Sequence, residues 1–468
     1  MSQTRNPSGQ FQTDADQITA DVDRRSFLRS STRGYMNTRS ATQDRFMDYE
    51  SARIAAGETK WEAINNLDVY LAQFADQLEA RGTTVHWCNN SEEARNVILG
   101  LLKKHEAKIV IKSKCMTTEE IHLNDLLVKE GLEVVESDLG EFIVQLREEA
   151  PYHFVFPAMH LKKEEINTLF KEKLQSVDTT DPEELTMVAR EVMRKKYLQA
   201  DVGISGANFG VAETGMISIT ENEGNARLTT ALPKVHIALM GIEKIIPRLE
   251  DLALLLPMLA TAGTGQHLTC YNSQLGGPRQ PGEVDGPEEM HVVLLDNHRT
   301  RLLADSQQRD ALRCIRCGAC LNVCPIFKNV GGHTYGTTYQ GPIGSVITPH
   351  LRGLKSWKHL SHSSSLCGAC TETCPVKIDL HHHLLRNRRN SASQGQGGVA
   401  ERILMKGFVF VMRRPWVYRT VGWIGRIAHV LSKPIHGTVL DPFNAWKKTR
   451  DLDDPAKQSF KEYWRSRK

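Results

Sequence analysis

The sequence predicts an α/β domain with a largely parallel sheet, followed by a small helical module rich in cysteine and a basic helical C-terminal extension. Three features of the 468-residue chain lead to this prediction. From about residue 60 to about residue 300, amphipathic helical segments alternate with short apolar runs, which is typical of βαβ units. Seven of the ten cysteines lie between Cys314 and Cys374. Residues 401–468 contain 15 Lys and Arg against six Asp and Glu.

The predicted α/β region carries signals for helices and for strands. Apolar residues at helical spacing predict the core-facing side of one helix; they are Leu67, Leu71, Phe74 and Leu78. Helices are expected to begin at Ser91 and Asp181, whose side chains cap helix N-termini, and residues 117–120 predict a capping box. Short apolar runs predict strands at 108–112, 133–137, 153–156, 216–220, 235–240 and 292–295.

The first 45 residues predict a flexible polar arm at 1–45, because they show little apolar periodicity. Arg24 and Arg25 resemble the core of a twin-arginine export signal, but the apolar stretch that such a signal needs does not follow them. The longest apolar run, 252–260, contains Pro257 and is far shorter than the roughly 20 residues of a membrane-spanning helix. We therefore expect a cytoplasmic protein, in which clustered cysteines are metal ligands rather than disulfides.

The first cysteine motif has the spacing of the bacterial ferredoxin motif. Cys314, Cys317, Cys320 and Cys324 are followed by Pro325. In such motifs three thiolates hold one [4Fe–4S] cluster, and the fourth holds a neighbouring cluster. Zinc is the alternative metal, but zinc motifs usually pair two Cys-x2-Cys units, and this run gives no tetrahedral site that uses all four thiolates.

The second motif repeats this spacing without its first cysteine, whose position is taken by Ser364. Exchange of the last cysteine between motifs assigns Cys314, Cys317, Cys320 and Cys374 to one cluster and Cys324, Cys367 and Cys370 to the other. The second set lacks a fourth thiolate. Ser364, a solvent oxygen, a partner's side chain and a [3Fe–4S] cluster all remain open as solutions.

Two adjacent clusters suit the passage of two electrons, one at a time, from a two-electron oxidation; purely structural clusters are the alternative. Gly203, Gly206 and Gly210 have the wrong spacing for a dinucleotide-binding loop, and no Walker A motif occurs. The formal net charge of +4 gives no reason to expect nucleic acid as a partner.

Weaker patterns predict a small-ligand site. Loops at 213–215 and 222–225 flank the strand predicted at 216–220, and Lys112 and Lys114 are placed to neutralise an anion; ordinary turn chemistry is the alternative. We expect Cys88, Cys115 and Cys270 in the core and the histidines 381–383 on a solvated surface. For the basic extension, an anionic membrane surface, a docking subunit and plain solvent are all open. A helical stripe is predicted there at Val417, Val421, Ile424, Ala428 and Leu431.

Several stretches together resemble the lactate-utilisation iron–sulfur protein family, over about residues 45–435. They are Lys112-Ser-Lys114 with Thr118-Glu-Glu120, Asp201-Val-Gly-Ile204, Ala212-Glu-Thr-Gly215, Asn222-Glu-Gly-Asn225, Pro278-Arg with residues 281–289, the cysteine motif 314–325, Gly331-Gly-His-x-Tyr335-Gly, and residues 365–370. Cys115 stands where a Ser is expected, and residues 1–45 have no clear counterpart in the family.

The resemblance implies a LUD domain at 46–300 with an α/β fold of the NagB/RpiA/CoA-transferase type. A small α-helical, ferredoxin-like two-cluster module at 301–395 and the basic helical extension at 396–468 are expected to follow. It implies the same seven cysteine ligands in the same two sets. Family members work with a cysteine-rich-domain subunit and a LUD-only subunit in oxidising L-lactate to pyruvate. The expected role is that of a non-catalytic electron-transfer subunit, with an acceptor such as quinone and with peripheral contact to the inner face of the membrane as an option.

Three other functions compete with this one. A LUD-domain enzyme would act on a small anionic or acyl substrate, with Glu213 as carboxylate nucleophile. The iron–sulfur subunit of a glycolate oxidase would share the ferredoxin half, but would not explain residues 60–300. A redox-sensing regulator would use the three-cysteine cluster, but no DNA-binding signature accompanies it.

Overall fold

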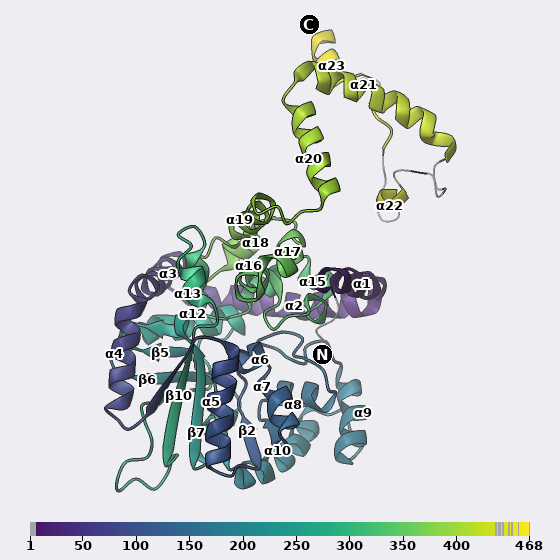
Figure 1. The fold of residues 1–468 in the computed structure, drawn as a ribbon. Helices are drawn as coiled ribbons and strands as arrows, with labels where there is room; N and C mark the ends of the chain where they lie inside the picture. Colours follow the sequence, from purple (N-terminus) through teal and green to yellow (C-terminus); the bar gives the residue numbers. More distant parts are fainter. Residues whose placement is uncertain are drawn as a thin grey trace. The chain divides into compact units, whose positions relative to one another are not determined.

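Six parallel strands form the main sheet of the computed structural model (Figure 1). Their order across the sheet is β1 (Thr84–Cys88), β10 (Glu289–Leu295), β7 (Val235–Gly241), β4 (Val202–Ser205), β2 (Ile109–Lys112) and β3 (Glu133–Glu136). Four of these strands confirm predicted runs, whereas β1 and β4 were not predicted. β4 is short and contains Gly203, where an added Cβ would lie 2.0 Å from the Thr229 carbonyl oxygen of a neighbouring helix.

A second, smaller sheet has the order β8 (Ile245–Ile246), β5 (Phe209–Val211), β6 (Met216–Glu221) and β9 (Tyr271–Leu275). The strand predicted at 216–220 therefore exists as β6, but it pairs antiparallel with β5 and β9. The strand predicted at 153–156 is wrong. Those residues form bends, in which His153 Nδ1 accepts hydrogen bonds from the amides of Val155 (2.9 Å) and Phe156 (3.2 Å).

Both faces of the main sheet are covered, since alternate residues of its strands pack into hydrophobic clusters on opposite faces. Val293 and Leu295 of β10 pack with α5 and α7, whereas Val292 and Leu294 pack with α4 and the small sheet. The helices of this region are α3 (Tyr49–Asn65), α4 (Leu67–Glu79), α5 (Ser91–Lys104), α6 (Met116–Glu120), α7 (Leu123–Lys129), α8 (Leu139–Leu146), α9 (Lys163–Leu174), α10 (Pro182–Gln199), α11 (Asn225–Ala231), α12 (Leu252–Gly263) and α13 (Arg299–Leu303).

The predicted N-termini of three helices can be compared with the observed ones. α10 begins as expected, with Asp181 accepting from the Glu183 amide at 2.8 Å. α5 also begins at the expected place, although Asn90 rather than Ser91 is its N-cap. The capping box predicted at 117–120 is wrong, since the N-cap of the five-residue α6 is Cys115, without a side-chain cap.

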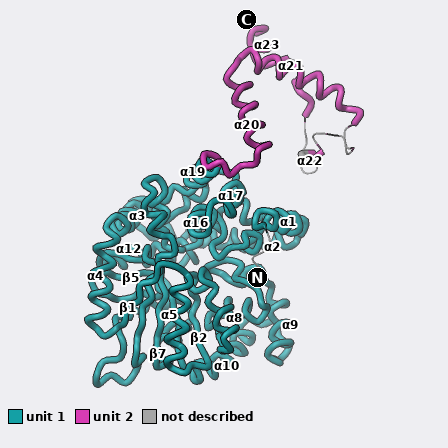
Figure 2. The backbone as a smooth tube through the Cα atoms, viewed as in Figure 1, with its two compact units in different colours: residues 1–391 teal, residues 392–468 magenta. Residues whose placement is uncertain are grey.

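The cysteine module (residues 309–391) follows the α/β region and belongs to the same compact unit, residues 1–391 (Figure 2). It is helical, as predicted. Its elements are η3 (Arg309–Arg313), α14 (Ala319–Val323), α15 (Phe327–Val330), η4 (His333–Tyr335), α16 (Gly341–Arg352), α17 (Leu354–His362), α18 (Ala369–Thr373) and α19 (Leu380–Ser393), the last of which crosses the unit boundary.

The prediction of a flexible arm is wrong for residues 6–45, whereas residues 1–5 of the predicted arm lie outside the described residues. Residues 7–43 form α1 (Pro7–Ala20) and α2 (Val22–Gln43), and both helices pack on the cysteine module. Leu28 is 1% exposed, and Phe11 meets the ring of Tyr335 edge-on at 6.0 Å. The Arg24 guanidinium lies 5.5 Å from the Tyr152 ring centroid, so the twin-arginine segment is part of the folded unit.

The second unit, residues 392–468, is helical, in line with the expected extension. It contains α20 (Val399–Met412), α21 (Pro415–Ser432), η5 (Lys433–Ile435), α22 (Asn444–Lys447) and α23 (Phe460–Ser466). The structure describes residues 6–435, 438, 441, 444–447, 450, 453–456 and 458–467. Within these residues, no helix is both long and apolar enough to span a membrane.

Candidate functional site

Two short helices of the cysteine module repeat each other in sequence and in backbone geometry. Cys317-Gly-Ala-Cys320 recurs as Cys367-Gly-Ala-Cys370. The glycine before α14 has a φ of +77° and the glycine before α18 a φ of +82°, a region that favours glycine. Both helices end at a cysteine in extended conformation, and the two helices pack against each other. The module is therefore a pseudo-symmetric pair of cysteine loops.

The first cysteine group lines one small space. Its sulfur-bearing members are Cys314, Cys317, Cys320 and Cys374, and the other walls are largely apolar. Burial, followed by the neighbouring thiolates of Cys374 and Cys314, raises the pKa of Cys317 to about 12. Burial likewise raises the pKa of Cys374 to about 11. Sulfur atoms gathered in an apolar space ionise only with a compensating positive charge, which a bound metal supplies.

The second cysteine group contains Cys324, Cys367 and Cys370. Burial, followed by the thiolates of Cys324 and Cys367, raises the pKa of Cys370 to about 12. Burial and the charge of Cys367 also raise the pKa of Cys324. Cys367 is exposed, so this group lies closer to the surface than the first. Cys314, Cys317, Cys320 and Cys374 thus line one space, and Cys324 and Cys367 lie near enough to Cys370 to influence its pKa.

Ser364 occupies the position in the second loop that Cys314 holds in the first. The Leu366 amide donates to Ser364 Oγ at 3.2 Å, as the Arg316 amide donates to Cys314 Sγ at 3.4 Å. Leu366 and Arg316 also share a positive φ, 55° and 60°. The two loops therefore have matching backbones, and a hydroxyl replaces the sulfur in one of them.

Buried cations lie next to the first cysteine group. Lys60 Nζ donates to the carbonyl oxygens of Glu243 (2.7 Å) and Ile245 (2.9 Å). Burial lowers the pKa of Lys60 to about 7, while nearby Glu243 opposes this shift. Glu243 also pairs with Arg299 (2.6 Å) and Arg316 (3.0 Å), and the Cys314 thiolate helps to raise the pKa of Arg316. These cations favour negative charge on the first group.

Two arginines from outside the module fix its second loop. The Arg53 guanidinium donates to the carbonyl oxygens of Glu372 (2.5 Å) and Cys374 (2.9 Å). Arg39 of α2 donates to the hydroxyl of Thr373 and, at 2.9 Å, to its carbonyl oxygen. No local sequence pattern points to Arg39 or Arg53, because their partners lie more than 300 positions away.

Known proteins match the chain in three successive segments. Residues 71–295 match the LUD domain, residues 310–378 a 4Fe-4S dicluster domain, and residues 381–468 the family described as Lactate utilisation protein B, C-terminal. Proteins named Lactate utilization protein B from Bacillus velezensis and Shouchella clausii are each 44% identical to the chain, over 90% of this chain and 89% of theirs. The chain belongs to the lactate utilization protein B family.

This family membership confirms the resemblance drawn from the motifs. The relative from Bacillus subtilis is 42% identical over 90% of this chain and 88% of its own length. The dicluster match supports iron–sulfur clusters at the cysteine module of this lactate utilization protein B family member. Among solved structures, a DUF162 family protein from Deinococcus radiodurans aligns at 14% identity over 49% of this chain, with a TM-score of 0.29, too low to support an argument.

The residues that suggested a small-ligand site in the LUD loops have partners within this family member. Lys112 is buried, and its ammonium group pairs with Glu136 at 2.7 Å and Glu119 at 3.3 Å, so it has no free charge for an anion. Lys114 Nζ donates to the Val155 carbonyl oxygen at 2.5 Å. Glu213 is exposed and accepts from the Leu249 amide at 2.9 Å. Of the two lysines of the anion site expected at the helix after Lys114, Lys112 is therefore paired with carboxylates and Lys114 with a backbone carbonyl.

The loop at 222–225 contains one unusual carboxyl group. Glu223 accepts from the Leu139 amide at 3.1 Å. Burial, together with the charge of Asp138, raises the pKa of Glu223 to about 7. This carboxyl group lies at the N-terminus of α8, whose first residue is Leu139.

The burial predicted for the three isolated cysteines and for the histidines 381–383 is confirmed for some of these residues and wrong for others. Cys88 and Cys115 are buried as predicted, whereas Cys270 is exposed. The solvated surface predicted for 381–383 is wrong for His383, which is fully buried and lies 2.8 Å from Asp310. A helix face that packs against η3 explains this burial.

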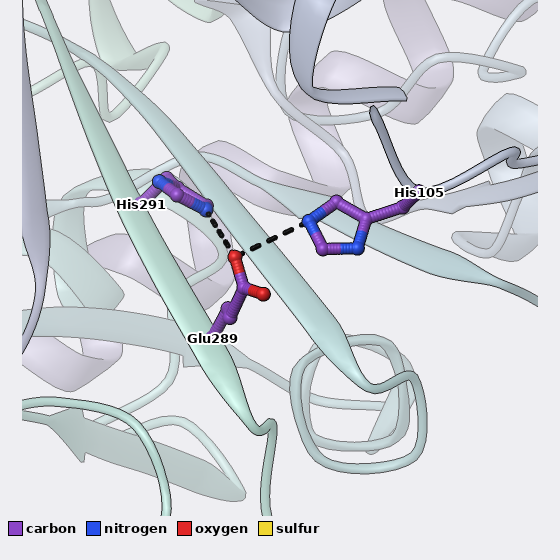
Figure 3. A group of neighbouring side chains, drawn as sticks. All are labelled: His105, Glu289 and His291. Atoms are coloured by element: carbon purple, nitrogen blue, oxygen red, sulfur yellow. Dashed lines mark ion pairs between the residues drawn. The ribbon is translucent and has the colours of Figure 1, made fainter. Parts of the chain in front are cut away.

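His105, Glu289 and His291 form a cluster at the amino end of the inner strand β10 (Figure 3). Glu289 Oε2 lies 3.2 Å from His105 Nε2 and 3.4 Å from His291 Nε2. The same oxygen accepts from Lys104 Nζ at 2.9 Å. This carboxylate is shared by three side chains that connect the end of α5 to β10.

Proposed function

We propose that the protein is the iron–sulfur electron-transfer subunit of an L-lactate-oxidising complex. The observation that carries this proposal is the gathering of seven cysteines into two groups in one module, in a chain whose relatives are named Lactate utilization protein B. Oxidation of lactate to pyruvate releases two electrons and two protons. Iron–sulfur clusters accept and release electrons one at a time. Relatives named for lactate favour this substrate over glycolate.

We propose two ligand sets for two clusters. Cys314, Cys317, Cys320 and Cys374 hold the first, and Cys324, Cys367 and Cys370 hold three corners of the second. The proposal is supported by the common space that the first four cysteines line and by the mutual charge effects among the other three. Replacement of Cys374 by Ser is expected to remove the first cluster's EPR signal and to leave that of the second. An unchanged first signal would contradict the crossed assignment.

For the fourth corner of the second cluster we propose Ser364, whose hydroxyl proton would leave to solvent on binding iron. Support comes from its place in the repeat, where its oxygen accepts the hydrogen bond that Cys314 sulfur accepts in the other loop. Ser364→Ala is expected to give the EPR signal of an oxidised [3Fe–4S] cluster, and Ser364→Cys a complete cluster with a changed spectrum. The matched control is Ser365→Ala at the exposed neighbour. A Ser364→Ala spectrum identical to wild type would leave solvent or a partner as the ligand.

The electron-transfer role is tested by anaerobic EPR before and after addition of L-lactate. The assay uses the chain alone and the chain with the two proposed partners, a cysteine-rich-domain subunit and a LUD-only subunit. Cluster reduction only in the presence of the partners is the expected result. Reduction by lactate alone would place the dehydrogenase site in this chain, and no reduction with both partners would contradict the proposal. A quinone analogue added afterwards tests the proposed acceptor, because it should reoxidise the clusters.

We also propose a peripheral contact between the second unit and an anionic membrane surface on the cytoplasmic side. α21 carries exposed Trp416 (68%) and Trp423 (62%), and residues 401–468 contain 15 Lys and Arg against six Asp and Glu. Aromatic and basic side chains on one helical unit suit the interface of an anionic bilayer. Co-sedimentation with phosphatidylglycerol vesicles, but not with phosphatidylcholine vesicles, is expected for the full chain. Equal or absent binding to both vesicle types would contradict this contact.

The LUD domain, proposed at 46–300, is assigned to the NagB/RpiA/CoA-transferase lineage as part of the same proposal, with the iron–sulfur module at 301–395 and the extension at 396–468. Its parallel sheet covered by helices on both faces supports the lineage. We also propose a cytoplasmic location, because a cluster of cysteines that serve as metal ligands fits a reducing compartment.

A further inference from the structure

A pocket of about 200 Å³ lies where the carboxyl ends of the main-sheet strands meet the cysteine module. On the sheet side it is lined by Ser91 and Arg95 of α5, by His122 and by Asn297, all of which follow strands of the main sheet. Ligands of open parallel sheets bind at this edge. The pocket is distinct from both cysteine groups and from the LUD loops at 213–215 and 222–225.

The module side of the pocket is formed by the loop before α16 and by α16 itself. Thr337 and Tyr339 lie in the loop, and Thr348 and Arg352 lie on α16. The hydroxyl oxygens of Thr337 and Thr348 are 3.4 Å apart. Two parts of the fold therefore contribute polar side chains to one small space.

The pocket carries an excess of positive charge. Arg95 makes one long hydrogen bond, 3.4 Å, to the Ile121 carbonyl oxygen, and the Arg352 guanidinium lies 4.6 Å from the Trp357 ring centroid. Across the described residues, neither arginine has a carboxylate within 4.0 Å. The two cations thus face the pocket without an acidic partner.

The one carboxylate in the lining, Glu120, is already satisfied. It accepts hydrogen bonds from Arg299 (2.7 and 2.9 Å), from Tyr339 (2.6 Å) and from Asn297 (2.6 Å). Arg299 and these hydrogen bonds hold the pKa of Glu120 below its usual value in spite of burial. Its hydrogen bonds are therefore taken up by Arg299, Tyr339 and Asn297, and its charge acts on Arg352 only from a distance, where it opposes the pKa shift caused by burial.

The positive charges of Arg95 and Arg352 both act on His122. Burial lowers the pKa of His122, the charges of Arg352 and, to a smaller extent, Arg95 lower it further, and Asp125, 3.9 Å from His122 Nδ1, opposes the shift. Burial also lowers the pKa of Arg352. The two guanidinium groups consequently act on the same point of the pocket, where an anion would be stabilised.

We propose that this pocket binds a small carboxylate between Arg95 and Arg352. A guanidinium presents a planar pair of donors that matches a carboxylate. The hydroxyls of the lining threonines suit a hydroxyl or oxo group on the adjacent carbon. A volume of about 200 Å³ equals the share of roughly six or seven water molecules, so an acid of a few carbons fits and a nucleotide does not. This binding goes beyond electron transfer and does not require it.

One wall of the pocket reaches the first cysteine group. The Tyr339 ring centroid lies 4.6 Å from the guanidinium carbon of Arg316, and Arg316 donates its amide hydrogen to Cys314 Sγ. A carboxylate in the pocket would therefore change the charge next to the Cys314 loop. This contact provides a spectroscopic readout beside the binding constant.

The test is isothermal titration of the anaerobically purified full chain, with its iron content measured, using L-lactate, pyruvate and inorganic phosphate as probes. Saturable binding of at least one of the two carboxylates is expected. Arg95→Gln and Arg352→Gln should each weaken it roughly ten-fold or more, the effect of losing a charge-assisted hydrogen bond. Arg190→Gln, at an exposed position of α10, is the matched control and should bind as wild type. All three variants should retain the iron content of wild type.

Three results would overturn the proposal. They are no saturable binding of either carboxylate, binding that is unchanged in both pocket variants, and tighter binding of phosphate than of both carboxylates. The last result would assign the pocket to a different anion. Since the titration needs no electron transfer, its failure is distinguishable from a failure of the EPR experiment above.

Discussion

Two helices near opposite ends of the chain, α2 and α20, differ in how far their apolar side chains are exposed. α2 is a very polar helix, yet its Leu28 is 1% exposed against the cysteine module. α20, described over its whole length, buries none of its residues, and Leu404 is 72% exposed. α2 belongs to the unit that contains the cysteines, and α20 belongs to the second unit. Local composition therefore indicates neither which helices pack on the module nor which present apolar surface.

The largest expected effect is on iron retention, when the N-terminal helices or the second unit are deleted. Deletion of residues 1–45 removes the hydrogen bonds from Arg39 to Thr373 and the helices that pack on α14 and α15. We expect this variant to lose most of its iron on exposure to air, because solvent and oxygen reach the cysteine groups. Deletion of residues 396–468 should leave iron per chain unchanged. Equal retention by both deletions, measured as iron content and visible absorbance over time, would show that α1 and α2 do not protect the module.

Truncation of one leucine in each of the two helices, α2 and α20, compares their contributions to stability. Leu28→Ala leaves a cavity in a packed core and is expected to lower the free energy of unfolding of the first unit by about 2–5 kcal/mol. Leu404→Ala, at an exposed site, should change it by less than about 0.5 kcal/mol. Anaerobic urea denaturation monitored by tryptophan fluorescence measures both. Similar midpoints for the two variants would contradict the assigned packing of α2.

The hydrogen bonds to the second cysteine loop give a smaller effect. Arg53→Gln leaves the carbonyl oxygens of Glu372 and Cys374 without their donor, which should cost about 1–3 kcal/mol of stability. Arg402→Gln on α20 removes an exposed cation and serves as its control. The same denaturation experiment applies, with iron content as a second readout. An Arg53→Gln variant as stable as Arg402→Gln would mean that solvent replaces this donor without loss.

The smallest effect is expected in membrane affinity. Arg419→Gln removes one exposed cation of α21 and should weaken binding to phosphatidylglycerol vesicles about five-fold, the share of roughly 1 kcal/mol per basic residue near an anionic surface. Arg29 hydrogen-bonds Asn329 at 2.7 Å in the first unit, so Arg29→Gln should leave vesicle binding unchanged. Vesicle titration at low ionic strength measures both variants. A larger loss for Arg29→Gln would move the contact surface to the N-terminal helices.

Much of the site was predictable because its chemistry is local in sequence. The spacing of Cys314, Cys317 and Cys320 places three thiols in one loop, and the repeat with Ser364 in the first position is visible without coordinates. Strands such as β7 were predictable because a buried parallel strand is a continuous apolar run. β1, at the edge of the sheet with Trp87 exposed, lacks that pattern and was missed.

Other features depend on partners distant in sequence, which no local pattern encodes. Lys112 was interpreted as an anion ligand, but Glu136 comes to lie 2.7 Å from its ammonium group. Arg95 and Arg352 share a pocket only because the carboxyl edge of the sheet packs on α16. The sequence by itself determined the cysteine chemistry, the α/β class and the helical extension, since each rests on spacing or periodicity within a short segment. Only the tertiary structure decided which charges are neutralised, which helices are buried and where a positively charged pocket remains, because these depend on which distant side chains the fold brings within a few ångströms.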